Sequence, residues 1–312
     1  MTRVSVILPF FNSERYLAEA LESIRRQSFS DFELLLINDG SSDHSADIAQ
    51  EMASKDSRIV LLHGDHRGGA QCRNDGISMA KGELIAMMDS DDVAEAERLA
   101  HQVRFLESNP ECCAVGTQAI RIDPDGWAIN TWRVPEEHEE IDNSHMRGIS
   151  GQIIHPSVMM RKSFVQRVGG YRPGVAEDYD LFLRLAEIGR LANLPQALMQ
   201  YRLHTKSTTL GSAYSVWCSA RKALEEAWIR RGRADSPPHC QPAPVQQSEE
   251  DLAWCWAREA FASQYFGTAR KHAYRLVWKR PSDFKRWVLF AAACAGPVAF
   301  RAKCVFPYRL GH

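Results

Sequence analysis

The segment RVSVILPFFNSERYLAEALESIRRQSFSDFELLLINDG (residues 3–40) places two apolar, β-branched runs on either side of a stretch with helical spacing. Continuous apolar runs of this length are typical of buried strands, and recurrence every three or four residues is typical of an amphipathic helix. The helical positions are Leu17, Ala20, Leu21 and Ile24. We therefore expect a strand over residues 3–9, a helix, and a second strand over residues 32–37.

The same alternation continues to residue 92. A turn at Asp39–Ser42 and a glycine pair at Gly68–Gly69 each precede a stretch with helical spacing, and two further apolar runs follow them. These runs predict strands over residues 59–62 and 83–88. Strict alternation of apolar strands and helices is typical of a parallel sheet covered on both faces, so the predicted fold class is α/β. Strand-like pieces and a helix around Tyr179–Ile188 predict a second region over residues 113–210.

Polar and glycine residues follow each of the four predicted strands, where ligands bind in open sheets of this kind. The four strand ends are Pro9–Asn12, Asn38–Asp43, His63–Gly69 and Asp89–Asp92. No G-x-G-x-x-G fingerprint follows any strand, and Ala70–Gln71 stands where a P-loop requires Lys–Ser/Thr. The sequence therefore argues against dinucleotide-dependent dehydrogenases and P-loop NTPases.

Asp89–Ser90–Asp91–Asp92 is the sharpest chemical signal, because three carboxylates in four residues repel one another. A divalent cation with a preference for oxygen ligands would relieve this repulsion, and Mg²⁺ usually takes one or two carboxylates together with water and phosphate. The alternative is a solvated acidic turn that caps the next helix. The apolar strand before it favours the cation site.

Charge is distributed unevenly along the chain. The net charge is −1, which argues against a generally basic nucleic-acid binder. Residues 267–312 contain ten Lys or Arg and one acid, a local charge of +9, so the rest of the chain carries −10. Such asymmetry suggests a charged surface partner. The eight cysteines form no Cys-x-x-Cys pair and no signal peptide is evident, so we expect reduced thiols in the cytoplasm.

Five segments together resemble the inverting glycosyltransferases of family 2, bacterial type, which have the GT-A fold. They occur in the family's order and cover about residues 3–210. They are VSVILPFFNSERYLAEALESI, INDGSSD, GGAQCRNDGISMAKGELIAMMDSDD, HPSVMMRKSFVQRVGGYRPGVAEDYDLFLRLAEIG and YRLHTKSTT. The resemblance implies a Rossmann-like nucleotide-binding sheet, mixed overall, with a nucleotide-sugar half over residues 1–112 and an acceptor-side half over 113–232. A Pro-rich linker (233–248) and a helical, basic C-terminal region (249–312) are expected beyond them.

The resemblance also implies roles for individual residues. A nucleotide sugar, most simply a UDP-sugar, would be bound by Pro9, Phe11, Glu14, Asp39, Arg73, Asp89 and His204. Asp89 and Asp91 would hold Mg²⁺ or Mn²⁺, and Asp178 would be the general base that deprotonates the acceptor hydroxyl. Simpler structural interpretations remain open: a core aromatic for Phe11, a turn for Asp39, a surface charge for Arg73, a helix-dipole partner for Asp178 and a structural hydrogen bond for His204.

The expected activity is metal-dependent, inverting transfer to a hydroxyl of a glycan or lipid-linked acceptor. A Q-x-x-R-W motif is absent, which favours single additions over processive synthesis. Two alternatives stay open: a sugar nucleotidyltransferase, and a catalytically inactive nucleotide-sugar-binding or scaffold protein.

The apolar run WVLFAAACAGPVAF (residues 287–300) is too short to span a bilayer. With its basic and aromatic flanks it predicts either peripheral contact with the inner face of the membrane or a packed helical hairpin. The oligomeric state is left open.

Overall fold

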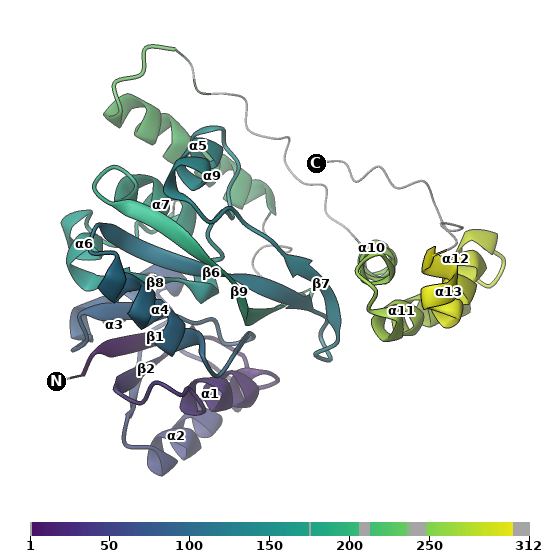
Figure 1. Cartoon of the computed structure of the whole chain (residues 1–312). Coiled ribbons are helices and arrows are strands. Elements are labelled where there is room, and N and C mark those ends of the chain that lie inside the picture. The colour runs from purple at the N-terminus through teal and green to yellow at the C-terminus, as the bar shows by residue number, and fades with distance from the viewer. Residues whose placement is uncertain (1, 175, 206–212, 236, 238–247, 302–312) are drawn as a thin grey trace. The chain divides into compact units, whose positions relative to one another are not determined.

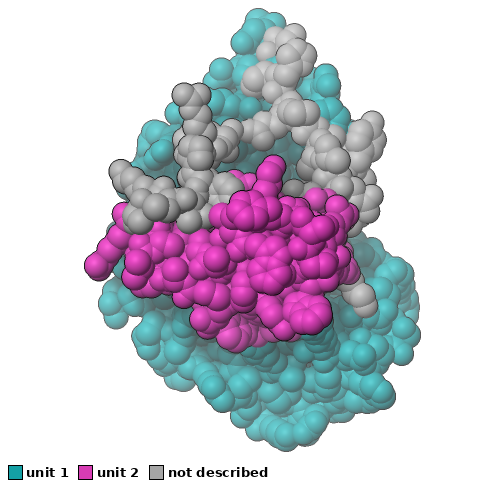
Figure 2. All heavy atoms as spheres, turned by 90° about the vertical axis from the view of Figure 1, so that its right-hand side faces the viewer, with its two compact units in different colours: residues 1–119, 133–201, 214–243 teal, residues 120–132, 202–213, 244–312 magenta. Residues whose placement is uncertain are grey.

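The computed structural model describes residues 2–174, 176–205, 213–235, 237 and 248–301. The chain divides into two compact units, coloured separately in Figure 2. Unit 1 comprises residues 1–119, 133–201 and 214–243, and unit 2 comprises residues 120–132, 202–213 and 244–312. Lys206 and Ser207 of the YRLHTKSTT segment lie outside the described residues, as does most of the Pro-rich segment.

The four strands expected in the N-terminal part are confirmed and lie side by side in parallel in unit 1 (Figure 1). Their order in the sheet is β3-β2-β1-β4. They are β1 (Val4–Phe10), β2 (Phe32–Asn38), β3 (Ile59–His63) and β4 (Leu84–Met87). Because the strands are parallel, their carboxyl ends lie at one edge of the sheet.

Three helices connect these strands, as the alternation predicts. They are α1 (Leu17–Arg25), α2 (Ser45–Lys55) and α3 (Gly69–Met79). The four apolar positions predicted for α1 are all fully buried. Helix α3 approaches β1 so closely that a Cβ atom at Gly76 would lie 2.7 Å from Cγ2 of Ile7. A larger residue at position 76 would push α3, and Arg73 with it, away from the sheet.

The rest of the sheet is antiparallel, so the nine-stranded sheet is mixed. Strand β8 joins β4 to β6, and the full order is β3-β2-β1-β4-β8-β6-β9-β5, with β7 paired to β6. The additional strands are β5 (Val93–Ala94), β6 (Cys112–Ile122), β7 (Ala128–Trp132), β8 (Met159–Arg161) and β9 (Arg190–Arg202).

Five α-helices and a 3₁₀ turn complete the part of unit 1 that the structure describes. They are α4 (Arg98–Ser108), α5 (His138–Met146), η1 (His155–Ser157), α6 (Lys162–Arg167), α7 (Glu177–Leu185) and α9 (Ala213–Arg230). One core cluster, formed by the sheet with α3, α5, α6 and α7, contains Ile7, Leu35, Ile85, Met160 and Phe182, each almost completely buried. The prediction of a helix near Tyr179 is confirmed.

Unit 2 combines the β6–β7 hairpin with the C-terminal helices. These helices are α10 (Glu249–Ala262), α11 (Phe266–Lys279), α12 (Phe284–Ala295) and α13 (Pro297–Arg301). Buried Asp123 in the hairpin lies 2.6 Å from Nζ of Lys271 and 2.7 Å from Nε2 of His272, both in α11. The helical C-terminal region expected from the sequence is confirmed. Across the described residues, no helix combines the length and apolar character needed to cross a membrane.

Candidate functional site

Hydrogen bonds connect the loops at the ends of β1, β2 and β4. The backbone N–H of Asn12 donates to Oγ of Ser41 (3.1 Å), and the N–H of Ser42 donates to Oδ1 of Asn12 (2.8 Å). The hydroxyls of Ser13 and Ser90 share a hydrogen bond of 2.8 Å. Asn12 has a φ of 48°, a left-handed conformation that asparagine tolerates better than most residues. The predicted convergence of these strand ends is therefore observed.

Asp39 is buried and organises the loop that precedes α3. Its carboxylate accepts the backbone N–H of Arg67 (2.7 Å) and of Gly68 (3.0 Å). Gly68 has a φ of 88°, which favours glycine at this position. A carboxylate oxygen has more than one acceptor site, so these bonds leave capacity for a ligand N–H. Recognition of a base by Asp39 stays a prediction.

Phe11 is 43% exposed, so it is not a core aromatic. Its ring lies 4.3 Å from that of His66, with 35° between the planes. The two rings come from the ends of β1 and β3 and form a partly exposed aromatic surface to which a planar base could stack. No spacing in the sequence indicates that His66 meets Phe11.

The other two N-terminal candidates have different surroundings. Pro9 is half-buried within β1. Glu14 is exposed, and its Oε2 accepts the backbone N–H of His44, just before α2. The N–H of Glu14 itself donates to Asp43 (3.1 Å). These contacts connect Glu14 to the residues just before α2. Its role toward a donor stays a prediction.

Arg73 on α3 joins two acids that are far apart in the sequence. Its Nη1 donates to Oε2 of Glu177 (2.8 Å), and its Nη2 donates to Oδ1 of Asp89 (3.2 Å). The side chain is only 16% exposed, which excludes the interpretation as a surface charge. Burial alone would lower the pKa of Arg73, but Asp89, Tyr171 and Glu177 raise it above its ordinary value. The guanidinium is therefore a fixed positive charge in this site.

Tyr171 lies next to Arg73 and forms a hydrogen-bonded pair with His155. The guanidinium carbon lies 5.7 Å from the centre of the Tyr171 ring, and the tyrosine hydroxyl is 2.8 Å from Nε2 of His155. Asn74 bonds both the N–H and the carbonyl of Tyr171. Burial, aided by Arg73 and opposed by Asp89, lowers the pKa of His155 to about 4, so this histidine is neutral at pH 7.

The predicted base, Asp178, lies in the first turn of α7. It is half-buried, and its Oδ1 accepts the backbone N–H of Tyr179 (2.8 Å). The charges of Asp178 and Asp89 both act on His155 and on Tyr171. Burial raises the pKa of the neighbouring Glu177, although Arg73 opposes this shift. Asp178 and Asp89 therefore both lie near the pair formed by His155 and Tyr171.

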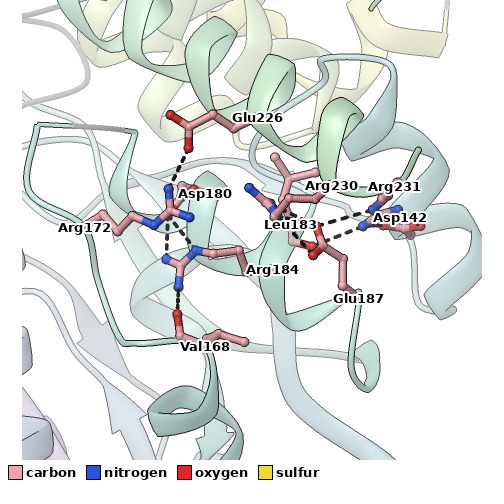
Figure 3. A network of polar contacts seen from close by, with 10 residues as sticks. All are labelled: Asp142, Val168, Arg172, Asp180, Leu183, Arg184, Glu187, Glu226, Arg230 and Arg231. Atoms are coloured by element: carbon pink, nitrogen blue, oxygen red, sulfur yellow. Dashed lines mark hydrogen bonds and ion pairs between the residues drawn. The ribbon is translucent and has the colours of Figure 1, made fainter. Parts of the chain in front are cut away.

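A network of ion pairs holds α7 in place (Figure 3). Buried Asp180 and Arg184 pair one turn apart on α7, and Arg184 donates to the carbonyls of Val168 and Gly170. Gly170 has a φ of 69°, and a Cβ atom there would lie 2.6 Å from Oδ1 of Asn74. Arg184 thus fixes the turn that leads into Tyr171, and glycine lets this turn approach α3.

Helix α9 supports α7 through ion pairs, also drawn in Figure 3. Arg230 pairs with Glu187 just after α7, and Arg231 pairs with Asp142 on α5 (2.7 Å). An apolar cluster that includes Tyr179, Leu183, Leu224 and Trp228 lies between these helices. The segment that carries Glu177 and Asp178 is therefore rigidly supported.

Residues 5–168 match the family model described as glycosyl transferase family 2, which is more than half of the chain. The chain belongs to this glycosyltransferase family. The O-antigen biosynthesis glycosyltransferase WbnJ of Escherichia coli is 31% identical over 233 residues, which is 73% of this chain and 90% of WbnJ. An uncharacterized glycosyltransferase of Haemophilus influenzae is 30% identical over 219 residues, covering 66% of this chain and 67% of that protein.

Solved structures show the same GT-A fold. The S. aureus TarS 1–349 complex with UDP-GlcNAc has a TM-score of 0.59 at 17% identity and covers 93% of this chain and 79% of TarS 1–349. The mannosyltransferase PcManGT from Pyrobaculum calidifontis, in complex with GDP-Man and Mn²⁺, has a TM-score of 0.56 at 19% identity, with 96% of this chain and 86% of PcManGT covered. The expected fold class, an α/β GT-A fold with C-terminal helices, is confirmed.

In this family 2 glycosyltransferase, Asp89 and Asp91 after β4 are the residues that would hold a divalent cation, and this role stays a prediction. Asp89 and Asp91 are half-buried carboxylates, and Asp89 already accepts a hydrogen bond from a cation, the Arg73 guanidinium. No cluster of three or more His, Cys, Asp or Glu in the described ranges could enclose a metal ion. Two carboxylates with a shell completed by water and diphosphate match the preference of Mg²⁺.

Arg98 is a buried charge that sequence reasoning missed. It lies behind the acidic segment, completely buried, and donates to the carbonyl of Met87 (2.8 Å). Burial lowers the pKa of Arg98, while Asp92 and Asp89 oppose this shift. Its position on the same helical face as Leu99 and Leu106 was a signal that it would face the core. Arg98 supplies a countercharge for the carboxylates from the protein side.

His204 belongs to a different compact unit from the other candidate site residues. It is half-buried, follows β9 by two residues and belongs to unit 2, whereas Arg73, Asp89 and Asp178 belong to unit 1. Its role toward the donor stays a prediction.

Proposed function

We propose that this glycosyltransferase transfers a sugar, with inversion, from a UDP-sugar to a hydroxyl of a glycan or lipid-linked acceptor. The observation that carries the proposal is the contact of Arg73 with both Asp89 and Glu177, next to Asp178, at the carboxyl ends of the parallel strands. Arg73 is a fixed cation between Asp89, on the side proposed for the diphosphate, and Glu177, which adjoins the proposed base. A cation in this position suits a reaction in which negative charge develops on a leaving diphosphate. The UDP-GlcNAc complex of TarS supports UDP as the nucleotide.

The reaction balances with Asp178 as the only base. The acceptor oxygen bonds to the anomeric carbon while the bond from that carbon to the diphosphate oxygen breaks, and the hydroxyl proton passes to Asp178. Attack opposite the leaving group inverts the anomeric centre, and one base suffices. Arg73 binds the diphosphate, Phe11 and His66 stack against the base, and Asp39 accepts its N–H. Mg²⁺ or Mn²⁺ held by Asp89 and Asp91 would act as a Lewis acid on the diphosphate.

Two alternatives have less support. A sugar nucleotidyltransferase would normally have a basic, glycine-rich loop after the first strand, where this chain has PFFNSER (residues 9–15). A catalytically inactive sugar-binding protein would not need Asp178. Incubation of the wild-type protein with a panel of nucleotide sugars and Mn²⁺ tests the proposal: release of UDP from a UDP-sugar is expected. Absence of turnover with every donor would favour the inactive alternative.

Replacement of Arg73 by Met is expected to weaken UDP binding in the presence of Mn²⁺. Hydrogen bonds to charged groups contribute about 1.5–3 kcal/mol, so the Kd should rise roughly 10- to 150-fold. Calorimetric titration measures this change. Arg26→Met is the matched control, because Arg26 is 75% exposed just after α1. An unchanged Kd in a folded Arg73→Met protein would contradict the proposed role.

We also propose that the basic C-terminal region contacts a membrane that carries the acceptor. Its excess of cations supports this proposal.

A further inference from the structure

The outer surface of α11 and α12 carries a strip of aromatic side chains, defined as Tyr274, Trp278, Trp287 and Phe290. Successive rings are neighbours along the strip. The centre of the Tyr274 ring lies 6.1 Å from that of Trp278 and 5.8 Å from that of Phe290, and the ring centres of Trp287 and Phe290 are 6.3 Å apart. Trp278 is 72% exposed, and Tyr274 and Trp287 are about half exposed. The strip therefore runs across both helices as one surface.

This exposure is not needed to build unit 2. The two helices pack through Ala273, Leu276 and Leu289, which are buried together, and of the strip only Phe290 packs against this cluster in the described residues. Phe284, at the start of α12, is 78% exposed as well. Single exposed apolar residues are ordinary, but contiguous exposed aromatic surface marks a site of interaction.

The two helices that carry the strip are rich in cations, and several of these pair with acids of other elements: Lys271 and Arg275 with Asp125, and Arg280 with Glu250. Residues 266–295 contain seven Lys or Arg and a single acid, Asp283. Asp283 pairs with buried Arg286, so it does not offset the exposed cations. Lys279 follows Trp278 and Lys285 follows Phe284, and both lysines are exposed. The surface is thus an aromatic strip with a cationic margin.

We propose that this strip and the adjacent Lys279 and Lys285 rest on an anionic lipid bilayer surface. Trp and Tyr suit the boundary between headgroups and acyl chains, and lysines are attracted to anionic headgroups. A second copy of the chain fits less well, because a two-fold interface would place each cationic margin against itself. The inference rests on the proposed membrane contact and names the residues that make it.

Vesicle flotation of the full-length protein tests this inference. The protein should float with vesicles of phosphatidylcholine and phosphatidylglycerol and much less with phosphatidylcholine alone. Each lysine removed should lower the partition coefficient about fivefold, so Lys279→Gln with Lys285→Gln should lower it roughly 25-fold. Trp278→Ser with Trp287→Ser should abolish flotation. Ile229→Ser is the matched control, since Ile229 is 76% exposed on α9 in unit 1.

Three results would overturn the inference: equal flotation of the tryptophan variant and wild type, equal binding to both vesicle types, or a change of oligomeric state in the tryptophan variant without vesicles. The last result would identify the strip as an interface between copies. UDP release from a UDP-sugar, measured in the same preparations, separates the two proposals. Retained UDP release with no flotation refutes only the membrane surface, whereas flotation without UDP release refutes only the transferase.

Discussion

Replacement of Asp178 by Asn is expected to lower the turnover of the nucleotide sugar by about 10²- to 10⁴-fold, which is the usual contribution of a general base. Asparagine has the same shape and keeps the oxygen that accepts the N–H of Tyr179, so α7 should remain folded. It cannot take a proton from the acceptor hydroxyl. The rate of UDP release with saturating acceptor measures the effect.

Asp47→Asn is the matched control for this experiment, because Asp47 is 84% exposed on α2 and has no contact with the site residues described above. Donor affinity should be nearly the same in the Asp178→Asn variant and in wild type, since the base acts on the acceptor. Turnover of Asp178→Asn within twofold of wild type would refute the assignment of the base.

Replacement of Asp91 by Asn should also abolish most of the activity. Here the expected cause is weaker binding of the cation, whereas in Asp178→Asn it is loss of the general base. Loss of one carboxylate weakens the hold on Mg²⁺ or Mn²⁺, and the leaving diphosphate loses stabilisation. Loss of a single stabilising group in the transition state typically costs on the order of 10²- to 10³-fold in turnover. The Mn²⁺ concentration needed for half-maximal UDP release should rise in this variant, while it should stay unchanged in the Asp47→Asn control.

An unaltered requirement for Mn²⁺ in the Asp91→Asn variant would show that the acidic segment is only a helix-capping turn. The same experiment with Asp89→Asn is less decisive, because Asp89 also pairs with Arg73. Asp91 therefore gives the cleaner test of the metal site.

The parallel half of the sheet was predictable because its signals are local. Each buried strand is a continuous apolar run, and the apolar face of α1 repeats at helical intervals. The shared edge of the strands then predicts that Phe11, Asp39 and Asp89 lie on one side. Local pattern plus one topological rule is enough for this part of the fold.

The remaining features depend on contacts that no local pattern encodes. Arg73 meets Glu177 across 104 residues, and Asp123 meets His272 across 149 residues. No pattern in the sequence therefore indicates that residues 120–132 group with the C-terminal helices in one unit. The aromatic flanks of residues 287–300 are visible in the sequence, but their grouping with Tyr274 and Phe290 into one strip depends on how two helices pack.

The proposed binding of UDP together with a divalent cation is tested most directly by thermal stability. The melting temperature of the wild-type protein is measured with UDP, GDP or dTDP, each with and without Mn²⁺. A ligand that binds only the folded state raises the melting temperature. We expect UDP with Mn²⁺ to raise the Tm most, and Asp91→Asn to remove the additional effect of Mn²⁺. Stabilisation by GDP or dTDP but not UDP would overturn the choice of donor. No stabilisation by any nucleoside diphosphate, with or without Mn²⁺, would contradict the proposed site itself.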